Sequence, residues 1–363
     1  MNEDDYRILS YKNKAPISQK EDLSSLSLPK YKTPIKTKRT VRNIPTVPER
    51  VLDAPGILDD YYLNLLDWSS TNILAVALSN SVYLWNGESG QVTELCSLSE
   101  NDYVGSLSWI GDGSVLSLGD SNGCVQLWDV EKQKKIRTMT GHSARVGSLS
   151  WNSHILSSGS RSGDILNSDV RVSNHVTARM EHHTQEICGL KWSFDGSQLA
   201  AGGNDNLVSV WNQSGSLEHS FSAHTAAVKA LAWCPWQSKF LATGGGSHDR
   251  TIRFWDTTNG TNLHSVDSGS QVTSIVFSKD SRELVTSHGF AENQLIFWRY
   301  PSMTKVAEIA AHDSRILHMS VSPDYSTIVT AAADENLKFW KAFDRQENVK
   351  PSPSSPKKTI LLR

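Results

Sequence analysis

Histidine and aspartate recur along this chain at repeated spacings, and a pair of these residues is a common device for activating a nucleophile. The histidines are His142, His183, His224 and His312. The aspartates are Asp205, Asp249 and Asp334. A catalyst needs one such pair, whereas here the pattern returns three times. We therefore interpret it as a buried His–Asp–hydroxyl–Trp network, with Thr243 and Thr330 supplying hydroxyl groups.

Other reactive groups give no pattern typical of catalysis or metal binding. The four cysteines, Cys96, Cys124, Cys188 and Cys234, are far apart and include no C-x-x-C pair. Their spacing argues against a zinc site or disulfide scaffold and favours a reducing compartment. No G-x-S-x-G or phosphate-binding loop is present. We expect no enzymatic activity, no cofactor and no metal.

Tryptophan provides the repeat that must position these residues. One series of residues stands at the ends of short segments in which apolar and polar residues alternate. Its tryptophans are Trp85, Trp128, Trp211, Trp255, Trp298 and Trp340, and Ser168 takes the third place, between Trp128 and Trp211. A second series interleaves with it: Trp68, Trp109, Trp151, Trp192, Trp233, Phe277 and Val321. Both advance by 40 to 44 residues, the length of a WD40 unit of four strands. The sequence predicts an all-β, seven-bladed WD40 β-propeller over residues 51–345.

Closure of such a ring normally requires one strand from the beginning of the propeller to join the last blade. We expect this strand around Tyr61–Asp67 or just before it. Within each segment, as in Val208–Trp211, alternate side chains point to opposite faces of a blade. Aromatic side chains then pack between neighbouring blades, so that no blade is stable alone.

The segments outside the repeat have a different composition. Residues 1–50 are rich in Lys, Ser, Pro and Thr, and residues 346–363 are polar and proline-broken, so both are predicted to be disordered. The basic run within residues 30–50 suits a solvated linker, nuclear import or contact with an acidic surface. The net charge of −2 and the lack of a basic face argue against nucleic acid as a ligand. No apolar run is long enough for a membrane span and no signal peptide is recognisable.

Longer stretches resemble the Fizzy family of anaphase-promoting complex co-activators. They include VLDAP (51–55), DDYYLNLLDWSS (59–70), HSARVGSLSWN (142–152), LSSGSRSG (156–163), CGLKWS (188–193), GGNDN (202–206) and AVKALAWCPWQS (227–238). SHGFAENQLIFWRYP (287–301) is closer to Fizzy than to the Fizzy-related branch. The resemblance implies a substrate-recognition and activator subunit of this ubiquitin ligase. It implies ligase subunits, degron-bearing substrates such as cyclins and securin, and spindle-checkpoint proteins as partners, in nucleus and cytoplasm.

The resemblance also implies two peptide sites on the propeller. For the arginine of a destruction box, Asp67 and Glu335 match the family's acidic residues at the cleft between first and last blades, with Leu66 near the pocket for the motif's leucine. An arginine fork between carboxylates is both strong and oriented. For a KEN motif the matching residues are Asn204, Asn206, Ser247, Gln271 and Arg315.

The termini match the family less completely. The resemblance implies ligase docking by Arg7, Ile8, Leu9, Tyr11, Leu362 and Arg363. The Asp-Arg-aromatic-Ile-Pro box that activates the ligase is not recognisable, and Leu28–Ile35 is a weak match to the checkpoint motif. An alternative interpretation is therefore a paralogue that binds substrates or ligase without activating it. Thr33 and Ser355 fit the proline-directed pattern of cyclin-dependent kinase sites, where a phosphate would offset the basic charge.

Overall fold

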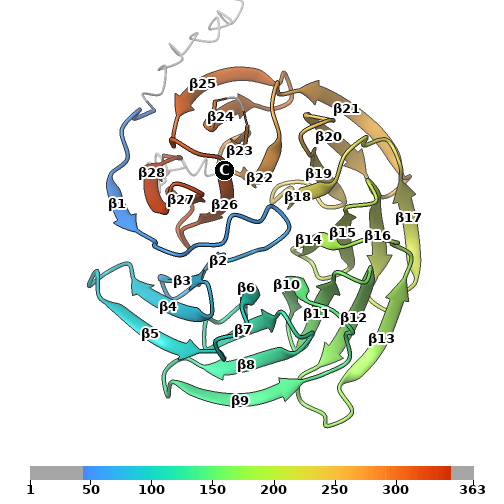
Figure 1. The fold of residues 1–363 in the computed structure, drawn as a ribbon. Helices are drawn as coiled ribbons and strands as arrows, with labels where there is room; N and C mark the ends of the chain where they lie inside the picture. Colours follow the sequence, from blue (N-terminus) through green and yellow to red (C-terminus); the bar gives the residue numbers. More distant parts are fainter. Residues whose placement is uncertain (1–43, 291, 345–363) are drawn as a thin grey trace, which may run out of the picture. The chain divides into compact units, whose positions relative to one another are not determined.

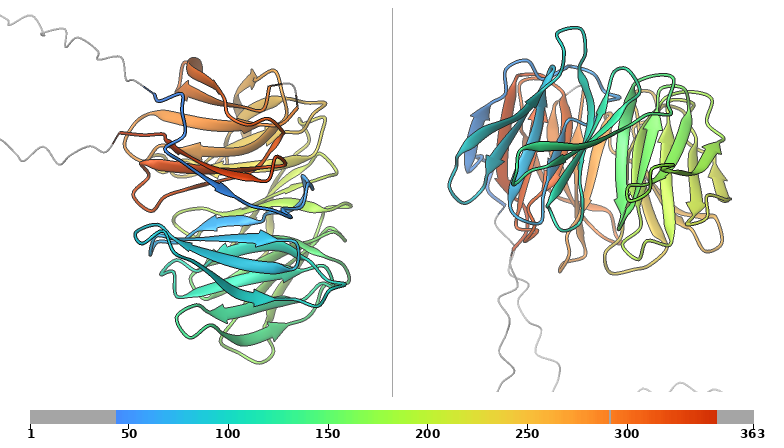
Figure 2. Two further views of the ribbon diagram at one scale, coloured as in Figure 1. Left: turned by 60° about the vertical axis from the view of Figure 1, so that its left-hand side comes forward. Right: turned by 90° about the horizontal axis from the view of Figure 1, so that it is seen from below.

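Residues 44–290 and 292–344 are described by the computed structural model. They form 28 strands in seven four-stranded antiparallel sheets, arranged as a ring around one axis (Figure 1). This confirms the predicted all-β propeller. Viewed from the side, the sheets stand next to one another in a single disc-like layer (Figure 2). Among the described residues there is no helix of the length and hydropathy that a membrane span requires.

Each blade runs from an inner strand beside the axis to an outer strand at the rim. Blade 1 contains β2 (Leu66–Trp68), β3 (Ile73–Leu78), β4 (Ser81–Asn86) and β5 (Val92–Ser97). Blade 2 contains β6 (Val104–Trp109), β7 (Val115–Asp120), β8 (Val125–Asp129) and β9 (Lys134–Met139). Blade 3 contains β10 (Val146–Asn152), β11 (Ile155–Ser160), β12 (Asp164–Asp169) and β13 (Val176–Glu181). Blade 4 contains β14 (Ile187–Trp192), β15 (Gln198–Gly203), β16 (Val208–Asn212) and β17 (Leu217–Phe221).

The remaining blades follow the same order until the ring closes. Blade 5 contains β18 (Val228–Trp233), β19 (Phe240–Gly245), β20 (Thr251–Asp256) and β21 (Thr261–Asp267). Blade 6 contains β22 (Val272–Phe277), β23 (Glu283–His288), β24 (Gln294–Arg299) and β25 (Thr304–Ala310). Blade 7 contains β26 (Ile316–Val321), β27 (Thr327–Ala332) and β28 (Asn336–Lys341), and its outer strand is β1 (Arg50–Asp53).

The closing strand lies earlier in the chain than the Tyr61–Asp67 segment. β1 pairs antiparallel with β28, with Arg50 opposite Phe339 and Asp53 opposite Asn336. Leu66–Trp68 instead forms the inner strand of blade 1. The folded part also begins before residue 51, because Ile44 is already buried against blades 6 and 7.

An aromatic cluster seals the seam between blades 7 and 1. The ring of Phe339 lies 4.8 Å from that of Trp85 and 5.7 Å from that of Trp68, and the Arg50 guanidinium lies 5.1 Å from the Trp85 ring centre. Rings at these separations add to the stabilisation given by apolar burial. The two ends of the propeller are thus joined by side chains as well as by the β1–β28 ladder.

The predicted His–Asp–hydroxyl–Trp network is confirmed in blades 4, 5 and 7. In blade 5, His224 Nδ1 contacts Asp249, its Nε2 lies 2.7 Å from Thr243 Oγ1, and Trp255 Nε1 donates to that hydroxyl at 2.9 Å. Blade 7 repeats the arrangement with His312, Asp334, Thr330 and Trp340. In blade 4 the hydroxyl is that of Ser209, which the sequence alone did not single out.

Blade 3 keeps only part of this network. His142 Nε2 lies 2.8 Å from Ser158 Oγ, but Ser168 occupies the place of the tryptophan. His142 Nδ1 is buried and has no hydrogen-bond partner among the described residues. Burial lowers the pKa of His142 to about 4, so the ring is neutral at pH 7.

Candidate peptide-binding surfaces

The upper face of the propeller is formed by two sets of loops. One set joins the second strand of each blade to its third strand, and the other joins the outer strand of one blade to the inner strand of the next. Residues 54–65 belong to the second set and connect β1 to β2; we call them the crossing segment. It extends from the rim toward the middle of the ring before returning to β2 (Figure 1).

The crossing segment is anchored to the blades by hydrogen bonds and ion pairs. Arg145 binds Asp60 Oδ2 through Nη1 and Glu186 Oε1 through Nε, both at 2.7 Å. Tyr61 Oη donates to the carbonyl of Val272 at 3.3 Å, and its ring packs near Cys188. The segment therefore forms a fixed part of the upper face.

Asn204 lies in the β15–β16 loop and touches the crossing segment directly. Tyr62 Oη donates to Asn204 Oδ1 at 3.0 Å, and Asn204 Nδ2 donates to Gln185 Oε1 at 2.7 Å. These bonds set the orientation of the amide and leave one N–H for a ligand. Asn204 and Tyr62 also line an upper-face hollow of about 590 Å³. Asn206, in the same loop, adopts a left-handed φ of 66°.

Ser247 and Gln271 lie in upper loops further round the ring. Ser247, between β19 and β20, is exposed. Gln271, just before β22, is only 6% exposed, and its Oε1 has no hydrogen-bond partner among the described residues. A buried amide oxygen without a partner is costly, so this atom is suited to accept a hydrogen bond from a ligand or from water.

Arg315 completes the predicted set just before β26. Its Nε donates to Asp59 Oδ1 at 2.6 Å and its Nη2 donates to the Asp59 carbonyl at 3.0 Å. The guanidinium carbon lies 5.1 Å from the centre of the Phe290 ring. All five residues predicted for the KEN motif thus lie in loops of one face, on blades 4 to 7.

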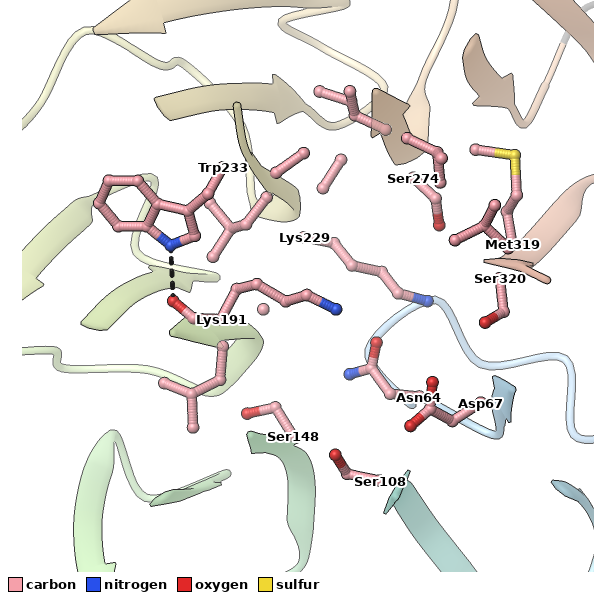
Figure 3. Close-up of a pocket in the computed structure, with 18 of the residues that line it drawn as sticks. Asn64, Asp67, Ser108, Ser148, Lys191, Lys229, Trp233, Ser274, Met319 and Ser320 are labelled. Carbon is pink, nitrogen blue, oxygen red and sulfur yellow. Dashed lines mark hydrogen bonds between the residues drawn. The ribbon is translucent and has the colours of Figure 1, made fainter. Parts of the chain in front are cut away.

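Asp67 and Leu66 occupy a different environment from the one predicted for them. Asp67 Oδ1 accepts from Trp68 N at 3.0 Å and Oδ2 accepts from Trp109 N in blade 2 at 2.8 Å. Burial raises the pKa of this carboxyl. Leu66 is buried. Asp67 belongs to the wall of the central channel, close to Asn64 and Ser108 (Figure 3).

Glu335 lies instead in the β27–β28 loop of blade 7. Its Oε1 accepts from Gly56 N at 3.0 Å, and its carbonyl accepts from Ala54 N at 2.7 Å. Asp67 and Glu335 share no partner among the described residues. Asp67 is thus bonded within blades 1 and 2, whereas Glu335 is bonded to the beginning of the crossing segment.

Near Glu335, at the seam between blades 7 and 1, the carboxylate on the neighbouring strand β1 is that of Asp53. It is exposed at the end of β1, opposite Asn336, which directly follows Glu335. The preceding Leu52 is half-buried against the core shared by blades 1 and 7. The resemblance was assigned to the later Leu66-Asp67 pair, so the sequence analysis did not single out Leu52 or Asp53. The available signal was a second Leu-Asp pair in the VLDAP stretch.

The central channel contains a pocket of about 270 Å³ whose walls carry Lys191 and Lys229 (Figure 3). Lys229 Nζ donates to the Leu317 carbonyl at 2.8 Å and lies 5.5 Å from the Tyr61 ring centre. Burial lowers the pKa of Lys229 to about 7. These contacts satisfy the buried ammonium group.

Several predicted residues fall outside the described part of the chain. They are the ligase-docking candidates Arg7, Ile8, Leu9, Tyr11, Leu362 and Arg363, and the phosphorylation candidates Thr33 and Ser355. Within the described residues no group of three His, Cys, Asp or Glu side chains is placed to hold a metal ion. The four cysteines are free.

The ring of seven sheets and the His–Asp–hydroxyl–Trp networks define a WD40 β-propeller. Residues 52–340 match the family described as the CDC20/Fizzy WD40 domain, and the chain belongs to this family. This confirms the resemblance seen in the sequence.

Individual relatives agree with this assignment. The anaphase-promoting complex subunit cdc20 of Dictyostelium discoideum is 49% identical, over 98% of this chain and 73% of the relative. The WD repeat-containing protein slp1 of Schizosaccharomyces pombe is 50% identical, over 98% and 74%. FIZZY-RELATED 3 of Arabidopsis thaliana is 51% identical but covers 83% of this chain. A chain in the crystal structure of the mitotic checkpoint complex is 50% identical with a TM-score of 0.82, over 93% of this chain and 99% of that chain.

Proposed function

We propose that this protein is a substrate-recognition and activator subunit of the anaphase-promoting complex, which binds degron peptides and performs no chemistry itself. The observation that carries the proposal is the convergence of Asn204, Gln271 and Arg315 on one face. The proposed partners are ligase subunits, degron-bearing substrates and spindle-checkpoint proteins, and the proposed location is nucleus and cytoplasm. The names of the relatives and of the matching crystal structure support these partners.

The upper face offers suitable groups for a Lys-Glu-Asn peptide. The Arg315 guanidinium suits the glutamate carboxylate, because charge-assisted hydrogen bonds are stronger than neutral ones. The free N–H of Asn204 and the unpartnered Oε1 of Gln271 suit the amide and backbone of an extended peptide.

The seam offers groups for a destruction box. We place the motif's arginine between Asp53 and Glu335, whose exposed carboxylates lie on neighbouring parts of β1 and the β27–β28 loop. Leu52 provides a half-buried apolar neighbour for the motif's leucine. This assignment replaces Asp67 and Leu66, whose contacts are internal to the channel wall.

The histidine–aspartate pairs do not favour an enzyme. In blades 4, 5 and 7 the carboxylate binds the histidine and the histidine binds a hydroxyl that also accepts from tryptophan. Groups so fully engaged stiffen a blade and are not free to exchange protons with a substrate.

Titration of labelled KEN and destruction-box peptides against the purified chain tests the recognition half of the proposal. We expect Asn204→Ala and Arg315→Ala to weaken the KEN peptide about tenfold or more while sparing the other peptide. Glu335→Ala should have the reverse pattern. Failure of the wild-type chain to bind either peptide would refute substrate recognition.

A reconstituted ubiquitination assay with a cyclin fragment tests the activation half. Added chain should stimulate substrate ubiquitination by the ligase. Inhibition of the ligase would instead support the alternative of a competing paralogue that binds without activating.

A further inference from the structure

Arg315 lies in the upper face, and one edge of its guanidinium group is already hydrogen-bonded to Asp59. Its Nε and Nη2 bind the carboxylate and the main-chain carbonyl of Asp59, at 2.6 and 3.0 Å. Asp59 is more exposed than Arg315, with 57% of its side chain accessible against 18%. The pair therefore lies at the surface with the aspartate on its outer side.

The remaining surface of this guanidinium is limited. The Phe290 ring lies near one side, with its centre 5.1 Å from the guanidinium carbon, and this phenylalanine is itself 59% exposed. No described residue accepts a hydrogen bond from Nη1. The edge formed by Nη1 and Nη2 is consequently the part left for a carboxylate, and such a ligand would arrive close to the Asp59 charge.

We infer that Asp59 determines the charge selectivity of the upper site, by neutralising Arg315 and repelling the acidic residue of an incoming peptide. This inference rests on the proposed function, since it concerns the glutamate of the KEN peptide. Asp59 orients the guanidinium through its two oxygens, yet its negative charge weakens the site for an acidic ligand. The same charge leaves a neutral ligand at this position almost unaffected.

Asp59→Asn separates these two effects. The amide keeps an oxygen that can accept from Nε, and the main-chain carbonyl remains in place for Nη2. Only the charge is removed. Because exposed charges at this range interact weakly, we expect the KEN peptide to bind roughly threefold to fivefold more tightly to the variant at low salt.

The experiment is a double-mutant cycle between protein and peptide. Wild-type chain and Asp59→Asn are each titrated with a KEN peptide and with the same peptide carrying glutamine in place of glutamate. The glutamine peptide should bind both proteins within about 1.5-fold, because its amide carries no charge for Asp59 to repel. The gain for the glutamate peptide should shrink as sodium chloride is raised from about 50 to about 500 mM.

Asp280→Asn is the matched control. This substitution removes the same formal charge, and Asp280 is exposed in the β22–β23 loop on the opposite face. It should leave both titrations unchanged. Equal effects of Asp59→Asn on the two peptides, or weaker binding of the glutamate peptide, would overturn the inference while leaving the upper site intact. Absence of binding to the wild-type chain would remove the site itself.

Discussion

Blades 4, 5 and 7 differ from blade 3 in what holds their upper loops. In the first three, an aspartate of the β-turn between second and third strands binds a histidine that is linked through a hydroxyl to a tryptophan. In blade 3 the histidine has a hydroxyl partner but no carboxylate and no tryptophan. The blades with the full network are also those whose turns carry predicted peptide contacts.

Three of the residues with predicted peptide contacts are direct sequence neighbours of network aspartates. Asn204 and Asn206 flank the network residue Asp205, and Glu335 directly follows Asp334. Asp205 also accepts from the main-chain N–H of Thr184 and of Leu207, which fixes the turn itself. One set of buried hydrogen bonds can therefore stabilise a blade and also position the loop for which peptide contacts are predicted.

Removal of a network carboxylate should have the largest effect. Asp205→Ala leaves His183 and two backbone N–H groups without their acceptor, in a site where the Asp205 side chain is 6% exposed. We expect a loss of about 3 kcal/mol in the free energy of unfolding, measured by urea denaturation with tryptophan fluorescence. Asp164→Ala in blade 3, where the side chain is 26% exposed, should cost less than about 1 kcal/mol. Equal losses would contradict the distinction between the blades.

Removal of the hydroxyl should have an intermediate effect. Thr243→Val deprives both His224 Nε2 and Trp255 Nε1 of their partner, so we expect a loss of about 2 kcal/mol. Ser158→Ala in blade 3 removes the partner of His142 and a long, 3.5 Å hydrogen bond to the Leu166 carbonyl, and should cost about 1 kcal/mol. The same denaturation series measures both. A larger loss in blade 3 than in blade 5 would show that the tryptophan bond contributes little.

Acidification should give the smallest of these differences in the free energy of unfolding, and it concerns His142 of blade 3. Because burial lowers the folded-state pKa of His142 to about 4, the unfolded chain takes up its proton first as pH falls below about 6.5. Stability is therefore fully present above that pH and is lost between about 6.5 and 4. His142→Gln should reduce this loss by about 1 kcal/mol, allowing for solvent screening of the partly accessible ring. An unchanged pH profile would mean that His142 does not titrate in this range.

The blades themselves were predictable because each tryptophan of the repeat marks the end of a strand whose alternation is visible in the local sequence. Trp211 and Trp255 end alternating strands that pack against neighbouring sheets, and both the alternation and the spacing are visible in the sequence. The five upper-face residues were chosen from the resemblance; the structure shows that all of them lie in upper loops, and their part in peptide binding stays a prediction.

The seam was not predictable in the same way. β1 is four residues long and pairs with a strand at the other end of the propeller, so no local periodicity marks it. Leu52-Asp53 and Leu66-Asp67 are the same dipeptide, and both lie within strands. The pairing of Asp53 opposite Asn336 and the bonds of Asp67 to blade 2 distinguish the carboxylate at the seam from the one in the channel wall, and both are tertiary contacts.

Titration of a labelled destruction-box peptide against Asp53→Ala and Asp67→Asn tests the assignment of the seam most directly. Circular dichroism and tryptophan fluorescence would first verify that each variant is folded. We expect Asp53→Ala to weaken the peptide about tenfold or more and Asp67→Asn to change its affinity less than about twofold. Strong loss of binding in Asp67→Asn, with Asp53→Ala binding like the wild-type chain, would contradict the assignment and return the arginine site to the channel wall.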